Sequence, residues 1–122
     1  MAKVILIVED EPKNLKLFRD LLQVSGYTTI EATDGKQAVE LAKAKKPSLI
    51  LMDIRMPVMD GLEATRILKA DATTRSIPIV ALTSYAMKGD NKMILQAGCD
   101  GYLVKPIFIQ ELLKKVAEHL SG

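Results

Sequence analysis

Residues 49–53, LILMD, are the most informative segment of the sequence, because a run of apolar residues leads directly into one carboxylate, Asp53. Pro47 precedes this run, and the turn-forming pair Asp60-Gly61 follows it closely. A continuous apolar run bounded in this way is typical of a strand that is buried on both faces of a sheet. Asp53 alone is ambiguous, because such an aspartate can simply cap the next helix, whereas a buried one needs a charged neighbour.

A second apolar run, VILIV at residues 4–8, also ends in acids, since Glu9 and Asp10 follow it at once. In an open parallel sheet, ligands bind beyond the carboxyl ends of the strands. If the two strands are neighbours, Glu9, Asp10 and Asp53 converge in one cleft, where like charges repel unless a cation lies among them. The ligand atoms would all be oxygen, so we expect a hard cation, most simply Mg²⁺.

The composition indicates one domain, because 122 residues with 48% hydrophobic side chains are enough for one core. The 17 basic and 15 acidic residues give a net charge of +2, too balanced to indicate a nucleic-acid or membrane surface. Cys99 is the only cysteine, so no disulfide can form within the chain. The sequence shows neither a secretory leader nor an apolar run of membrane length, and we expect a cytoplasmic protein.

Strand and helix patterns alternate along the chain. Pro12 suits the first position of a helix that Gly26 ends, and Asp34 with Gln37 resembles a capping box. Further patterns predict strands at 27–32, 77–82 and 101–104, and helices from 34 to before 47 and from 61 to about 71. A loop at 88–90 should precede a short helix through 93–97, and a last helix carries the stripe Ile109, Leu113, Val116 and Leu120. Five strands interleaved with five helices indicate an α/β fold with a parallel sheet covered on both faces.

Several motifs now fall at the ends of predicted strands: Glu9-Asp10, Asp53, Thr83 and Lys105-Pro106. Each is weak alone, but the set resembles the receiver domain of bacterial two-component response regulators, from residue 3 to residue 120. The stretch SYAMKGD at 84–90 and the later pair at 98–99 look most like DivK-type single-domain regulators. This resemblance implies a doubly wound, flavodoxin-like sheet with strand order 2-1-3-4-5. It also implies one receiver domain over residues 1–122, with no output domain.

The resemblance further implies a phosphoacceptor. Asp53 would form an aspartyl phosphate with a histidine kinase or a phosphotransfer protein as donor. Mg²⁺ would be held by Asp10 and Asp53, by Glu9 directly or through water, and by the backbone carbonyl of Arg55. Lys105 would pair with a phosphoryl oxygen, and the peptide bond after it is expected to be cis. The pair Glu9-Asp10 departs from the two aspartates common in the family, which leaves the coordination geometry open.

The same resemblance implies a switch and an output surface. Thr83 would hydrogen-bond the phosphoryl group, small Ser84 would leave room for it, and Tyr102 would turn inward. Arg55 and Tyr85 would flank the mouth of the site and hinder the attacking water, so we expect a slowly decaying phosphoprotein. The fourth helix, fifth strand and fifth helix would bind a downstream protein, and whether activation also produces a homodimer stays open.

Two other functions stay open at this point. A pseudo-receiver scaffold would bind partners without phosphorylation, although the complete set of acids, Thr83 and Lys105 argues against it. A Mg²⁺-dependent phosphohydrolase could use Asp53 as its nucleophile, but such enzymes usually carry a second acid two residues later, where this chain has Arg55. We therefore expect no enzyme, but a phosphoacceptor that assists its own phosphorylation and dephosphorylation and signals by binding other proteins.

Overall fold

The computed structural model describes residues 3–84 and 88–120, and strands alternate with helices throughout them. This alternation confirms the α/β class. None of the helices within these residues is long and apolar enough to cross a bilayer. In chain order, the elements are β1 (Val4–Val8), α1 (Pro12–Val24), β2 (Thr28–Ala32), α2 (Gly35–Lys45), β3 (Leu49–Asp53), α3 (Gly61–Ala70), β4 (Ile79–Thr83), α4 (Lys88–Ala97), β5 (Gly101–Val104) and α5 (Ile109–Leu120).

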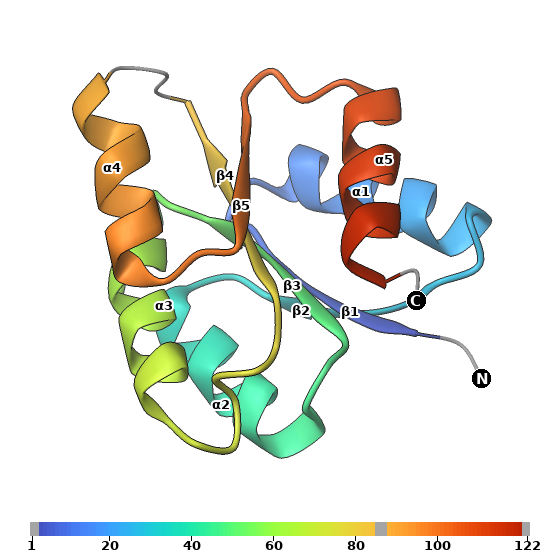
Figure 1. Ribbon diagram of the computed structural model, residues 1–122. Helices are drawn as coiled ribbons and strands as arrows, with labels where there is room; N and C mark the ends of the chain where they lie inside the picture. The colour runs from blue at the N-terminus through green and yellow to red at the C-terminus, as the bar shows by residue number, and fades with distance from the viewer. Residues whose placement is uncertain (1–2, 85–87, 121–122) are drawn as a thin grey trace.

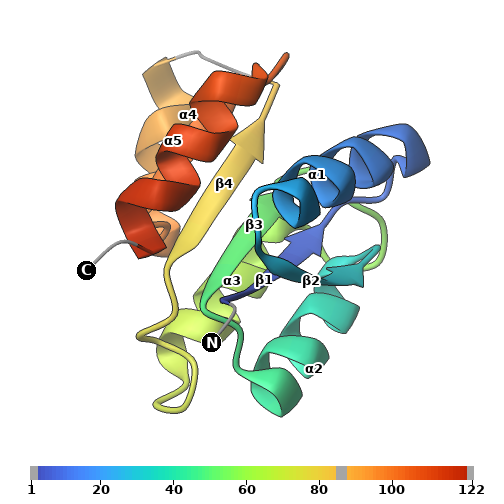
Figure 2. The ribbon, with the colours of Figure 1, turned by 90° about the vertical axis from the view of Figure 1, so that its right-hand side faces the viewer.

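The strands form one parallel sheet in the order β2-β1-β3-β4-β5. Figure 1 labels these strands and the helices around them. Figure 2 shows β4, β3, β1 and β2 following one another across the sheet. β1 pairs with both β2 and β3, so the direction of chain progression reverses there. The strand order predicted from the resemblance is confirmed, and the reversal is the place where such sheets bind ligands.

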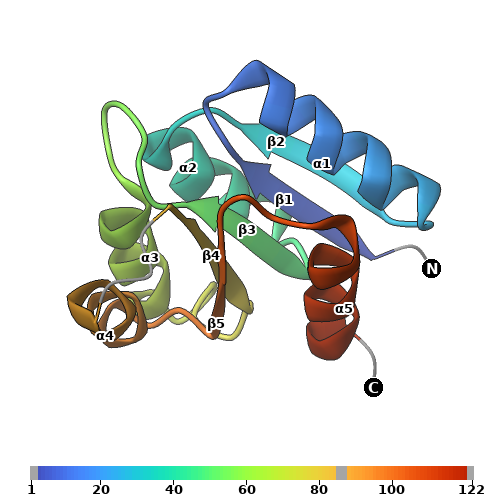
Figure 3. The same ribbon diagram turned by 90° about the horizontal axis from the view of Figure 1, so that it is seen from above.

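Helices cover both faces of the sheet, with α1 and α5 on one side and α2, α3 and α4 on the other (Figure 3). Alternate side chains of each strand point to opposite faces. The face under α1 and α5 buries Ile5, Ile7, Leu49, Leu51, Val80 and Leu82, packed on Phe18, Leu22, Leu112 and Val116. The opposite face buries Leu6, Val8, Ile50, Met52, Ile79 and Ala81, packed on Ala38, Ala42, Ala64, Leu68 and Ile94.

The first two helices begin and end as the sequence predicts. α1 starts at Pro12, and Gly26 just beyond it has a φ of +97°, the left-handed conformation that favours glycine. At the start of α2, the Asp34 Oδ1 atom accepts a hydrogen bond of 2.8 Å from the Gln37 N–H. The Gln37 side chain in turn accepts from the Thr33 N–H at 3.0 Å, rather than from the capping residue itself.

The loop between β3 and α3 packs too closely for larger residues at two glycines. A Cβ atom on Gly61 would lie 2.1 Å from the Asp53 carbonyl oxygen, and one on Gly35 would lie 2.3 Å from the Met59 carbonyl oxygen. The Gly35 N–H donates to that Met59 carbonyl at 2.9 Å. Between these contacts, Val58 is 80% exposed and has a φ of +68°. The loop therefore holds the end of β3 against the start of α2.

Two expectations about the carboxyl-terminal half were wrong in detail. α4 begins at Lys88, so residues 88–90 form its first turn rather than a loop. A glycine in a helix costs only about 1 kcal/mol, which the rest of a helix can outweigh. In α5 the fully buried residues are Leu112 and Val116, whereas Ile109 is 50% exposed. Of the predicted stripe, Val116 is buried and Leu113 and Leu120 pack, partly buried, against the core under α1 and α5, so Ile109 is its one wrong member. The stripe also missed Leu112, because Leu112 and Leu113 fit helical spacing almost equally well.

Candidate functional site

Three carboxylates meet at the carboxyl end of the sheet. One oxygen from each of Glu9, Asp10 and Asp53 lies within 4.8 Å of the other two. Glu9 and Asp53 are buried, with 1% and 5% of their surface exposed, while Asp10 is exposed. Because β1 and β3 are neighbours, the acids that follow and end these strands are brought together. The convergence expected from the two apolar runs is present.

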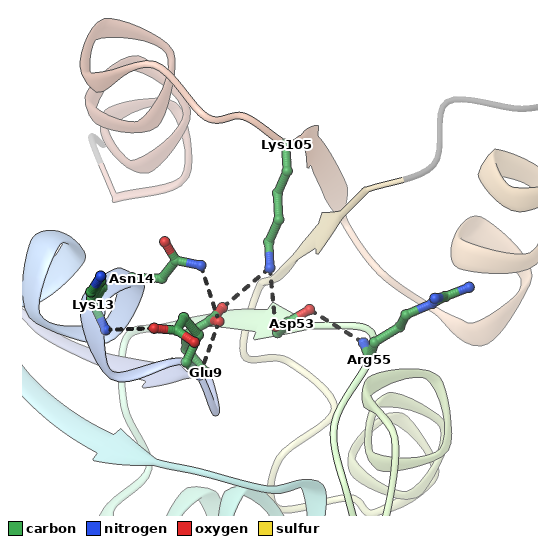
Figure 4. Close-up of polar contacts among 7 residues, drawn as sticks. Glu9, Lys13, Asn14, Asp53, Arg55 and Lys105 are labelled. Atoms are coloured by element: carbon green, nitrogen blue, oxygen red, sulfur yellow. Dashed lines mark hydrogen bonds and ion pairs between the residues drawn. The ribbon is translucent and has the colours of Figure 1, made fainter.

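Each carboxylate oxygen of Asp53 has a hydrogen-bond donor beside it. The Arg55 N–H donates to Oδ1 at 3.2 Å, and the Lys105 Nζ atom lies 3.1 Å from Oδ2. Figure 4 shows the Lys105 side chain reaching both Asp53 and Glu9, while the Arg55 side chain extends away from Asp53. These contacts fix the orientation of the Asp53 carboxylate at the end of β3.

Glu9 is buried beside Asp53, and this environment raises its pKa. Burial is the largest cause that raises the pKa of Glu9 from 4.5 to about 7, followed by the hydrogen bond and the negative charge of Asp53. The charge of Lys105 and a hydrogen bond from Asn14 act in the opposite direction but do not cancel the rise. Near neutral pH, Glu9 therefore binds a proton readily, mainly because burial disfavours its charged form and secondly because Asp53 lies beside it.

Lys105 follows β5 and faces both buried acids. Its Nζ atom lies 3.4 Å from Glu9 Oε2 as well as 3.1 Å from Asp53 Oδ2. Burial alone would lower the pKa of Lys105, but the charges and hydrogen bonds of Asp53 and Glu9 outweigh it and raise that pKa. Its backbone N–H donates to the Thr83 carbonyl at 2.7 Å, and its peptide bond to Pro106 is cis. Lys105 is therefore a cation fixed beside the carboxylates.

The remaining predicted site residues lie on β4, on β5 and just after β4. Thr83 is the buried last residue of β4, and Ser84 after it is exposed. Leu82 is the β4 partner of Asp53 in the sheet, so Thr83 lies one residue beyond the phosphoacceptor candidate. Tyr102 on β5 is half-buried against the core under α2, α3 and α4. Tyr85, predicted at the rim of the site, lies outside the described residues.

The donor set fits a hard divalent cation. Within the described part of the chain, the cluster offers carboxylate oxygens from three residues, and neither His nor Cys takes part. Mg²⁺ prefers such oxygen ligands. The three carboxylates face a single lysine, Lys105, which lies within 3.4 Å of Glu9 and 3.1 Å of Asp53. The Arg55 backbone, whose N–H contacts Asp53, lies at the edge of the same cleft.

Sequence reasoning missed Asn14, the third residue of α1. Its Nδ2 atom donates to Glu9 Oε1 at 3.4 Å. Asn14 and Lys105 also line a cavity of about 470 Å³ between α1 and the segment after β5. The signal was available, because a helix that starts at Pro12 turns an amide in its first turn back toward the strand end before it.

These features occur together in a known family. Residues 5–117 match the family described as the response regulator receiver domain. The chain belongs to this family. As a receiver domain, it is 47% identical over 121 residues to proteins named polar-differentiation response regulator DivK, from Brucella anthropi and Brucella ovis. The alignments cover 99% of this chain and 98% of each relative, which confirms the resemblance to DivK-type regulators.

Solved receiver structures agree with the fold. The receiver domain of the sensor histidine kinase PA1611 from Pseudomonas aeruginosa is 39% identical, with a TM-score of 0.93 and full coverage of both chains. That structure holds a magnesium ion coordinated in its active-site cleft. The chemotaxis protein CheY4 of Vibrio cholerae is 28% identical, with a TM-score of 0.92 over 98% of this chain and 100% of that one. The flavodoxin-like receiver fold is confirmed.

Proposed function

We propose that this receiver domain is a stand-alone response regulator that accepts a phosphoryl group on Asp53. The observation that carries the proposal is the buried Asp53 carboxylate, 3.1 Å from Lys105 Nζ and grouped with Glu9 and Asp10. The donor is a histidine kinase or a phosphotransfer protein. The similarity to DivK over nearly the whole length of both chains supports a regulator of this size that acts by itself.

In the proposed transfer, an oxygen of the Asp53 carboxylate attacks phosphorus. A new P–O bond forms while the P–N bond to the donor histidine breaks, and the imidazole nitrogen keeps the electron pair. The Arg55 N–H and Lys105 hold the carboxylate in one orientation, which lowers the entropy lost on reaching the reactive geometry. Lys105 then pairs with a phosphoryl oxygen as a point charge.

We propose that Glu9, Asp10 and Asp53, with the backbone carbonyl of Arg55, hold Mg²⁺. When bound, the ion supplies the positive charge that allows an anionic carboxylate to approach an anionic phosphoryl group. Glu9 must release its proton to serve as a ligand, and its raised pKa makes this release dependent on pH near neutrality.

Thr83 and Tyr102 are the proposed switch between the site and the surface. The Thr83 hydroxyl hydrogen-bonds the phosphoryl group, and exposed Ser84 leaves room beside it. Phosphorylation adds about −1.5 to −2 charge at one point, which is enough to bias the segment after β4. Tyr102, half-buried on β5, turns inward as Thr83 moves, and a target protein reads the change on the face of α4, β5 and α5.

We place this activity in the cytoplasm, in the receiver domain that residues 1–122 form. The signal passes by protein binding, without direct contact to nucleic acid or membrane, and the balanced charge of +2 supports this. The regulator is not an enzyme in the sense of turning over a separate substrate. Arg55 is exposed near the site, where it is proposed to slow hydrolysis of the aspartyl phosphate.

The test is incubation of the purified protein with acetyl phosphate and Mg²⁺, followed by intact mass spectrometry and peptide mapping. We expect the mass of one phosphoryl group to be added at Asp53, and no addition in Asp53→Asn or when EDTA replaces Mg²⁺. An unchanged mass, or a phosphoryl group on another residue, would overturn the proposal and favour a scaffold that works without phosphorylation.

A further inference from the structure

Each oxygen of the Glu9 carboxylate has its own donors. Oε1 accepts from the Glu11 N–H at 3.3 Å and from Asn14 Nδ2 at 3.4 Å. Oε2 lies 3.4 Å from Lys105 Nζ. Two donors use the acceptor capacity of Oε1, so Oε2 is the oxygen that Glu9 presents to the cleft. A glutamate side chain has one more rotatable bond than an aspartate side chain. The orientation of the Glu9 carboxylate therefore depends on these donors.

Asn14 occupies the boundary between Glu9 and the cavity beside α1. It is half-buried, and it lines this cavity together with Lys105, while Glu9 behind it is 1% exposed. Figure 4 shows the Asn14 amide directed at Glu9 from the first turns of α1. The Glu11 donor belongs to the backbone and is present for any residue there except proline. Asn14 is thus the side chain that supplies the second hydrogen bond to Glu9 Oε1.

We infer that Asn14 is a positioning residue that orients Glu9 for Mg²⁺ and favours Mg²⁺ over Ca²⁺; this inference rests on the proposed function. Mg²⁺ demands near-ideal octahedral geometry, whereas Ca²⁺ takes about six to eight oxygens and readily accepts both oxygens of one carboxylate. With Oε1 held by Glu11 and Asn14, Glu9 offers a single oxygen. Loss of Asn14 releases Oε1 to join Oε2, which suits the larger ion.

The test compares metal binding in variants of the full chain. Metal-free protein is titrated with MgCl₂ and, separately, with CaCl₂ by calorimetry at pH 8. Asn14→Leu keeps the approximate size of the side chain without its donor, and Asn14→Ala removes both. We expect the dissociation constant for Mg²⁺ to rise about tenfold, the size typical when a group that orients a metal ligand is lost. The dissociation constant for Ca²⁺ should rise less or fall.

Gln23→Leu is the matched control, because the Gln23 amide is also on α1 but donates to Thr29 Oγ1 at 2.9 Å, in a contact that involves none of the cleft carboxylates. It should change neither metal affinity. A second set of variants, built on Glu9→Asp, distinguishes an effect of Asn14 on Glu9 from an effect on packing. The shorter side chain in Glu9→Asp moves the carboxylate away from Asn14. Adding Asn14→Leu to Glu9→Asp should then leave the ratio of the two affinities unchanged.

Three results would overturn the inference. If the wild type binds Mg²⁺ and both Asn14 variants keep its Mg²⁺ and Ca²⁺ affinities, Asn14 does not position Glu9, while the proposed function stands. If both affinities fall equally, together with the urea midpoint in EDTA, Asn14 only stabilises α1. If the wild type itself binds no Mg²⁺, the proposed function fails first and the inference falls with it.

Discussion

At the carboxyl end of the sheet, Lys105 Nζ lies 3.1 Å from Asp53 Oδ2, and at the amino end Lys69 Nζ lies 2.9 Å from Asp100 Oδ2. The two ion pairs are similar in length, and both join segments far apart in the sequence. The two pairs differ in the charged and polar groups around them. This difference distinguishes an ion pair that stabilises the fold from one that lies in a candidate reactive site.

The pair at the amino end belongs to a closed network. Lys69 Nζ also donates to the carbonyl oxygens of Arg75 and Ile77, at 3.0 and 2.8 Å. Asp100 Oδ2 in turn accepts from the Ile79 N–H at 2.8 Å. All three protons of the ammonium group therefore have acceptors, and one positive charge meets one negative charge. Such a satisfied network joins α3, the start of β4 and the segment before β5.

The pair at the carboxyl end lacks this balance. Lys105 divides its charge between Asp53 and Glu9, both buried, and Asp10 lies in the same cluster. The pKa of Glu9 is raised to about 7 as a result of burial and of the neighbouring Asp53. Buried groups held against their ordinary acidity are typical of functional sites. The lesson is that the number of acids around a lysine indicates its role better than the length of the ion pair.

The largest expected effect concerns the two lysines and the rate of phosphorylation by acetyl phosphate. Lys105→Met should slow this reaction about 100-fold or more, because it removes a charge aimed at the reacting phosphoryl group. Lys69→Met should leave the rate within about twofold of wild type under conditions where the variant is folded. Intact mass spectrometry over time measures both rates. Equal rates for Lys105→Met and Lys69→Met would remove the functional distinction between the two ends.

The next effect is a dependence of the free energy of unfolding on pH that arises at the carboxyl end of the sheet. Because the pKa of Glu9 is about 7 in the folded chain and 4.5 ordinarily, the folded state binds an extra proton between these values. In EDTA, the free energy of unfolding should therefore fall as pH rises from about 4.5 to 7, by about 3 kcal/mol. Glu9→Gln should largely remove this fall. Asp71, whose pKa is lowered by hydrogen bonds from Thr73, titrates below this window.

Urea unfolding at several pH values measures this slope. A wild-type stability that rises between pH 5 and pH 7 in EDTA, with the same rise in Glu9→Gln, would show that Glu9 does not take up the proton.

A smaller effect is expected at the amino end. Lys69→Met should lower the free energy of unfolding by about 2 kcal/mol, because it leaves Asp100 and two carbonyl oxygens without their donor. Lys16→Met is the matched control, since the pair Lys16–Asp20 is 2.7 Å long but largely exposed. Exposed pairs of this kind contribute about 0–1 kcal/mol. Equal losses of free energy of unfolding in the two variants, measured by urea unfolding, would show that the additional hydrogen bonds of Lys69 do not contribute to stability.

The smallest effect concerns the loop after β3. Val58 is exposed and has a φ of +68°, a conformation that costs a β-branched residue about 1–2 kcal/mol. Val58→Asn should therefore raise the free energy of unfolding by about 1 kcal/mol, because asparagine tolerates this conformation. Val24→Asn, at an 89% exposed residue of α1, should give no such gain. Loss of stability in Val58→Asn would show that the strain is absent.

The sheet and the acidic residues at its carboxyl end could be predicted because short-range sequence patterns determine them. The apolar runs that lead into Glu9 and Asp53 indicate both the buried strands and the side of the sheet on which the acids lie. Parallel strands separated by helices then leave few topologies. The strand order itself came from the resemblance to receiver domains, since the patterns alone do not choose between the remaining arrangements.

Contacts between distant polar residues could not be predicted in the same way. Lys69 and Asp100 are 31 residues apart, and both look like ordinary exposed charges in the sequence. The closeness of Gly35 to Met59 likewise depends on how the loop after β3 folds over α2. In α5, the two adjacent leucines both lie against the core, and the pattern did not show that Leu112 is the fully buried one. Only the packed structure selects among such alternatives.

The most direct test of the difference between the two ends is Mg²⁺ binding by calorimetry at pH 8 in three aspartate variants. We expect one Mg²⁺ site in the wild type, with binding lost in Asp53→Asn and in Asp10→Asn and preserved in Asp100→Asn. A wild type that binds no Mg²⁺, or an Asp53→Asn variant that binds it as tightly as the wild type, would contradict the account.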